Sequence, residues 1–105
     1  MATGRLGASA ISSGTDTTVY TCPASTYSVV TVSFCNRSNS AAALRLAVSA
    51  ADAPTDAEWV EFDTEILAKG VLERTGLVLD AGKRIVAYSS GDATSVVVMG
   101  IETSA

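Results

Sequence analysis

The chain has 105 residues, of which 17% are charged, a formal net charge of −4 and no histidine. This length fits a single domain, residues 1–105, and its seven scattered Lys and Arg residues argue against a nucleic-acid partner, which clustered basic side chains would hold. Because histidine is the commonest general base and the commonest metal ligand, we expect a protein that is no enzyme and binds no metal or cofactor.

The N-terminal segment shows no targeting pattern. Residues 1–6 lack the apolar stretch of a signal peptide, and no apolar run in the chain approaches the ~20 residues of a membrane span. We therefore expect synthesis in the cytosol and no membrane contact. Residues 4–11 are expected to form an edge strand, or to belong to an N-terminal arm over residues 1–11.

A short strand is predicted over residues 17–22, where Pro23 ends it. Cys22 would then close this strand, and Cys35 would lie near the end of the next one. Two such positions are at opposite ends of neighbouring strands, which opposes a disulfide. We expect two free thiols, as is usual for a cytosolic product.

The clearest alternation of apolar and polar residues spans 27–36 and 42–49. The turn-forming residues 36–40 between these segments predict that they form a hairpin. The side chains expected to face the core are Val30, Val32 and Phe34 in the first segment, and Ala42, Leu44, Leu46 and Val48 in the second.

Further strands are predicted over 58–66, 71–79, 84–89 and 94–102, which gives about seven or eight in all. Glu73 falls among apolar positions of its strand and indicates a bulge or an edge position. The only helical signal is a single turn over 53–58, which Thr55 could cap. This spacing of short strands predicts an all-β antiparallel sandwich or jelly-roll-like domain.

Acidic residues concentrate in the segment 52–65. On a regular strand Glu61, Asp63 and Glu65 would share one face about 7 Å apart, opposite a core face formed by Val60, Phe62, Thr64 and Ile66. Three interpretations stay open for the acidic face: a cation site, an ionic contact with a basic neighbouring subunit, or a solvated surface. Calcium-binding loop spacing is absent, which disfavours the first.

Trp59 shares the acidic face by parity. A large aromatic side chain on the outside of a sandwich is either covered by a loop or offered to a partner. Low charge and many small side chains likewise fit either a surface that packs on another protein or an ordinary compact β domain. A sugar-binding platform of aromatic side chains is the weaker interpretation, because the chain is poor in aromatic residues.

Four segments carry a resemblance: residues 18–24, 30–37, 58–64 and 70–79, which read TVYTCPA, VTVSFCNR, EWVEFDT and GVLERTGLVL. In their residues and their order along the chain, these segments resemble the motifs of a group of small β-rich virion structural proteins of tailed bacteriophages. The resemblance implies a structural protein of the virion, most simply a head decoration or cement protein that forms a homo-oligomer, commonly a trimer, and binds the major capsid protein.

The alternative that the resemblance leaves open is a tail, neck or fibre module that binds other tail proteins or a host-surface glycan. In either case we expect interface residues and no catalytic ones. The candidate interface residues are Arg5, Leu6, Trp59, Glu61, Asp63 and Glu65.

Overall fold

The computed structural model describes residues 2–105, which form eight strands and one turn of 3-10 helix, η1 (Asp56–Glu58). Most of the chain therefore lies in strands. The strands are β1 (Thr3–Ile11), β2 (Thr17–Thr21), β3 (Thr26–Asn36), β4 (Ala42–Ser49), β5 (Trp59–Ile66), β6 (Val71–Leu79), β7 (Arg84–Ser89) and β8 (Thr94–Ser104).

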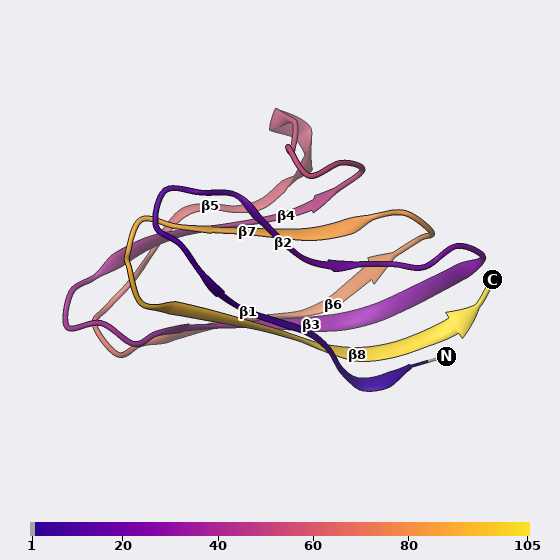
Figure 1. Cartoon of the computed structure of the whole chain (residues 1–105), viewed down its shortest axis with the longest axis horizontal. Coiled ribbons are helices and arrows are strands. Elements are labelled where there is room, and N and C mark those ends of the chain that lie inside the picture. Colours follow the sequence, from indigo (N-terminus) through magenta and orange to yellow (C-terminus); the bar gives the residue numbers. More distant parts are fainter. Residues whose placement is uncertain (1) are drawn as a thin grey trace.

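The strands pair into two four-stranded antiparallel sheets that lie face to face (Figure 1). Sheet A has the order β1-β8-β3-β6, and sheet B has the order β2-β7-β4-β5. Only β4 and β5 are neighbours both in sequence and in a sheet; every other connection crosses from one sheet to the other. This is the strand order of a jelly roll, and it confirms the predicted β-sandwich.

The predicted hairpin between residues 27–36 and 42–49 is wrong. β3 pairs with β6 and β8, whereas β4 pairs with β5 and β7 in the other sheet. The short connection crosses between the sheets, so that the apolar faces of the two strands meet across the core. The fully buried side chain of Asn36 holds this crossing, because its Nδ2 donates to the carbonyl oxygens of Ser40 (2.8 Å), Ile66 (3.3 Å) and Leu67 (3.2 Å).

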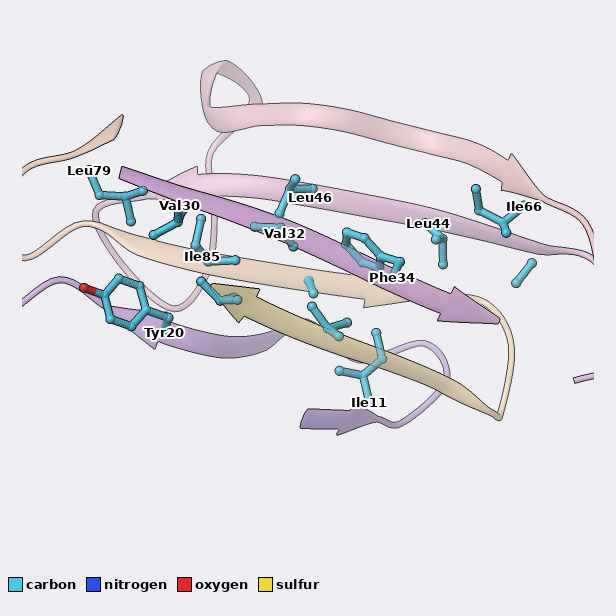
Figure 2. Packing of buried hydrophobic residues seen from close by; sticks show 14 of the residues in the cluster. Ile11, Tyr20, Val30, Val32, Phe34, Leu44, Leu46, Ile66, Leu79 and Ile85 are labelled. Carbon is cyan, nitrogen blue, oxygen red and sulfur yellow. The ribbon is translucent and has the colours of Figure 1, made fainter. Parts of the chain in front are cut away.

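The core lies between the two sheets and consists of side chains that alternate along the central strands (Figure 2). The predicted inward residues of β3 are fully buried, and so are Leu44 and Leu46 of β4. Val48 is half-buried and also packs against the core, beside Ile85 of β7. Burial of apolar surface between the sheets supplies the main stabilising term of the fold.

Residues 3–11 form an edge strand and not a free arm. β1 pairs with β8 along its length, and its last residue, Ile11, is buried in the core. A bulge between Arg5 and Gly7 turns the side chain of Leu6 inward, where it packs against the core. Gly7 has no room for a side chain, because a Cβ atom there would collide with the carbonyl oxygen of Val19.

Two local expectations are confirmed by the backbone. β6 is the other edge strand of sheet A, and it carries a bulge near Gly76, whose φ is 72°. Thr55 is the N-cap of η1 and forms a capping box with Glu58. Cys22 is buried and Cys35 half-buried, and both are free thiols in the structure.

Candidate interaction surfaces

Residues 2–105 enclose no pocket, and they include no group of three or more acidic or thiol side chains placed to hold a metal ion. Within the same residues no helix is long and apolar enough to cross a membrane. The surfaces of this domain that are large enough to contact another protein are the two broad outer surfaces of the sandwich. We call the outer surface of sheet A face A, and that of sheet B face B.

The predicted acidic face of β5 is interrupted by a bulge. Asp63 has a φ of 53°, and the pairing with β4 jumps from Leu44–Thr64 to Leu46–Glu61. The bulge reverses the alternation, so Glu61 points to the inner side of the strand while Phe62 points outward. Phe62, which was expected in the core, is 55% exposed on face B.

Glu61 lies at the edge of the sandwich, between the two sheets, and does not belong to an acidic face of β5. Its carboxylate accepts hydrogen bonds from Nη1 of Arg74 (2.8 Å) and from the hydroxyl of Thr64 (2.7 Å). Arg74 lies on β6, the edge strand of the opposite sheet, so this ion pair joins the two sheets. It also connects the EWVEFDT and GVLERTG segments, which gives those two motifs a structural role.

Asp63 remains on face B, where it binds Arg45 of β4. The two side chains are 2.6 Å apart between Nε and Oδ1. This hydrogen bond lowers the pKa of the Asp63 carboxyl and raises the pKa of the Arg45 guanidinium. Glu65 is exposed on the same face. Of the three acidic residues predicted to act together, only Asp63 and Glu65 share a face, and no cation site is formed.

Face B carries a group of aromatic rings around one guanidinium, which we call the aromatic cluster. It consists of Arg45, Trp59, Phe62 and Tyr88. The Cζ atom of Arg45 lies 4.1 Å from the ring centre of Phe62, 4.5 Å from that of Tyr88 and 6.0 Å from that of Trp59. Trp59 and Phe62 also meet edge to face, with ring centres 5.4 Å apart.

Another part of face B lies next to the connection between β4 and β5, which carries η1 and stands on the outer side of sheet B (Figure 1). Asp52 in this connection accepts hydrogen bonds from Thr18 and from Arg84, both at 2.6 Å. Beneath it, Ala47 and Val86 are fully buried although they point away from the core.

Glu58 holds the same connection in shape. Its carboxylate accepts hydrogen bonds from the backbone nitrogens of Thr55 (2.8 Å) and Ala50 (2.9 Å). These backbone bonds lower the pKa of Glu58, and the hydrogen bonds from Thr18 and Arg84 lower that of Asp52. Trp59, which follows this connection at the start of β5, is half-buried.

Face A has no such cover. Among residues 2–105, eight large apolar side chains are exposed, and six of them lie on face A. We call these six the apolar patch; the other two are Phe62 on face B and Leu67 in a loop. The members of the patch are Tyr27, Val29, Val71, Val78, Met99 and Ile101.

The strand register places several members of the patch side by side. Val29 of β3 is paired with Ile101 on one side and with Val78 on the other, which makes an apolar row across three strands. The next row pairs Arg5 with Met99. Alternation along 27–36 could have revealed this patch, because Tyr27 and Val29 share the outward parity, but the polar residues Thr31 and Ser33 concealed it.

The candidate interface residues are thus scattered over the molecule. Trp59 and Asp63 meet at Arg45, Glu65 is exposed on face B, and Arg5 is on face A. Leu6 packs against the core and Glu61 bridges the sheets. The sequence carries no signal for the outward position of Phe62. The outward position of Tyr88 could have been predicted from the alternation in 84–89.

Comparison with known proteins adds no family: no family model and no curated protein matches the chain.

Proposed function

We propose that this chain is a non-enzymatic structural protein of a tailed-phage virion, and that it decorates the head as a cement protein. The observation that supports this function is that the two opposite sides of one small sandwich each expose apolar side chains, those of the apolar patch on one side and the ring of Phe62 in the aromatic cluster on the other. A cement needs two separate contacts, because a protein with one binding surface can cap a partner but cannot join two.

The two surfaces suit different contacts. Arg, Trp and Tyr, which make up most of the aromatic cluster, are the residues most enriched among those that dominate binding energy at interfaces. The patch, by contrast, is broad and poor in charge. We assign the aromatic cluster to the capsid contact and the patch to contacts within the oligomer. Many copies bound in this way act together, so weak individual contacts give a strong clamp.

The test is to add the purified chain to undecorated heads of a phage that encodes it. We expect saturable binding, measured by co-sedimentation, and a higher melting temperature of the heads, measured by calorimetry. Phe62→Ser should weaken the binding at least tenfold, whereas Asp92→Asn in the exposed β7–β8 turn should not. Failure of the unmodified, folded chain to bind heads would contradict the proposal.

A second candidate is a module of the tail, neck or fibre, and the aromatic cluster is the observation that favours it. The exposed ring of Phe62 beside Trp59 offers a stacking surface of the kind that proteins present to sugars or to other proteins. If this candidate is right, antibodies against the chain will label tails and leave heads bare in electron micrographs, and added chain will not change the melting of heads.

A further inference from the structure

We propose that two copies of this chain stack through face A, with Arg5 of each copy opposite Glu73 of the other. The proposal goes beyond the virion role, since such a dimer would exist in solution whether or not the protein binds a phage head. It rests on the composition of face A, on the positions of its two charged strand residues and on the dimensions of the sheet.

Face A is apolar in a way that isolated domains rarely are. Soluble monomers seldom expose large continuous apolar surface, and a patch of this kind marks a contact with another protein. Here the exposed apolar side chains come from β3, β6 and β8, and the half-buried side chains between them include Thr31, Ser33, Cys35 and Val97. Nothing in residues 2–105 covers this surface, whereas face B is covered in part by its own loop.

Only two strand residues on face A are charged, Arg5 on β1 and Glu73 on β6, and both are exposed. Neither forms an ion pair with another residue of 2–105. They are three strand positions apart, or at least about 14 Å at the usual strand spacing, so they do not reach each other within one chain. A third charge, Arg37, lies at the end of the face and binds Ser95.

This arrangement is self-complementary under a two-fold rotation. A two-fold axis in the plane of the interface makes each residue meet a different residue of the other copy, reciprocally. An axis midway between Arg5 and Glu73, perpendicular to the line that joins them, puts each positive charge on a negative one, twice. It passes through the uncharged centre of the face, near Thr31 and Val97.

The same rotation brings one pair of the apolar row together. On an idealised sheet, with strands ~4.8 Å apart and outward residues ~6.8 Å apart along a strand, Val29 of one copy falls against Val78 of the other. A trimer lacks this reciprocity, because its contacts join two different patches. The two unpaired charges and the Val29–Val78 contact therefore make a second copy in two-fold stacking the occupant that we assign to face A.

The size of the face is adequate. Four strands at ~4.8 Å and about nine residues at ~3.4 Å give a flat area of roughly 19 by 30 Å, close to 600 Å². Two such faces would bury up to about 1,200 Å² in total, which is at the low end of specific protein–protein interfaces. Stacked sheets would lie about 10 Å apart, as they do inside the sandwich itself.

Two charge reversals test the pairing. Arg5→Glu gives a chain with two negative charges on face A, and Glu73→Arg gives a chain with two positive charges. Each alone places like charges opposite each other twice, so we expect each variant to dissociate at least about tenfold more readily than the unmodified chain. Mixing the two variants should restore a dimer, because every charge then meets its opposite.

The measurement is the molar mass by light scattering and sedimentation, at concentrations from micromolar to hundreds of micromolar, with circular dichroism to confirm folding. The unmodified chain is expected at twice 10.7 kDa. Lys83→Glu and Asp92→Lys, which make the same changes of charge type in loops away from face A, are the matched controls and should stay dimeric.

Three results would overturn the proposal. The first is an unmodified chain that is a monomer or a trimer over this range. The second is a dimer that the two reversals leave intact. The third is a mixture of the two variants that stays monomeric while the mixture of the loop controls behaves as the unmodified chain. None of these results bears on binding to heads, which is measured separately.

Discussion

Face A and face B belong to sheets of equal strand number in one small domain, yet they treat their exposed side chains in opposite ways. Face B is covered in part by other residues of the same chain. Val86 is buried beside a loop, and Arg45 lies between three aromatic rings. Face A is left with an apolar row and two charges that have no partner among residues 2–105. An apolar surface that the chain leaves uncovered, such as face A, is therefore a better indicator of a partner than one that is covered in part, such as face B.

The largest effect should come from placing a charge under the cover of face B. Val86 is fully buried beneath the β4–β5 connection, so Val86→Lys would bury an unpaired ammonium group or expel the loop, and we expect a loss of about 4 kcal/mol or more of unfolding free energy. Val78→Lys on face A should change it by less than about 0.5 kcal/mol. Urea unfolding at dilute concentration measures both. Equal losses would abolish the distinction between a covered and a bare face.

Acid should loosen face B through its carboxylates. The pKa values of Asp52, Glu58 and Asp63 are lowered in the folded state, chiefly by hydrogen bonds from Thr18, the Thr55 backbone and Arg45 respectively. A carboxyl whose pKa is lowered by folding stabilises the fold at pH values above its unfolded pKa, near 4. This stabilisation is lost as the pH falls through the folded pKa.

We therefore expect the melting temperature to fall below about pH 4 and the fluorescence of Trp59 to change with it. The double variant Asp52→Asn, Glu58→Gln should already melt lower at pH 7 and show a flatter decline with acid, because the groups that titrate have been removed. Asp92→Asn serves as the control. A double variant with the acid profile of the unmodified chain would show that the loop is not held by these carboxylates.

The aromatic cluster should respond to the shape of the cation as well as to its charge. Arg45→Met removes the guanidinium from between the rings and from Asp63, and we expect the melting temperature to fall by roughly a few degrees with a changed near-ultraviolet dichroism signal. Arg45→Lys keeps the charge but lacks the planar group, so it should restore only part of the loss. Full restoration by lysine would mean that charge alone matters here.

The smallest effect on folding is expected for Phe62→Ser, because this ring is 55% exposed and a surface substitution usually changes stability little. We expect its unfolding free energy to stay within about 0.5 kcal/mol of that of the unmodified chain, while its affinity for heads falls. A large loss of stability instead would assign Phe62 to the structure of face B and remove it from the capsid contact.

Most of the fold could be predicted from the sequence because alternation is a local signal. The strands over 42–49, 71–79 and 84–89 have the predicted bounds, and Thr55 caps the predicted single turn. Pairing is not local. The connection after Asn36 is compatible with a hairpin or with a crossing, and the contacts that hold the crossing, among them the amide's bonds to Ile66 and Leu67, come from far along the chain.

The surfaces were harder to predict than the fold, and one residue explains why. A left-handed backbone at Asp63 reverses the alternation of β5 in its middle, which moves Phe62 to the outside and Glu61 to the edge between the sheets. An Asp in the sequence predicts a left-handed backbone much less strongly than a Gly does. The expectations for Glu61 and Phe62 were therefore wrong, while those for Asp63 and Glu65 held, and a second register shift after Leu46 returns Trp59 to its expected outer face.

The order of strands in sheet A has a consequence for the time at which this protein can act. β8 is the last of the eight strands to leave the ribosome, yet it lies between β1 and β3. Until it is inserted, β1 has no neighbour in its sheet and the apolar row through Ile101 does not exist. Such non-local pairing folds slowly. Face A therefore cannot form before β8 has been synthesised, and nascent chains crowded on one messenger cannot assemble through it until then.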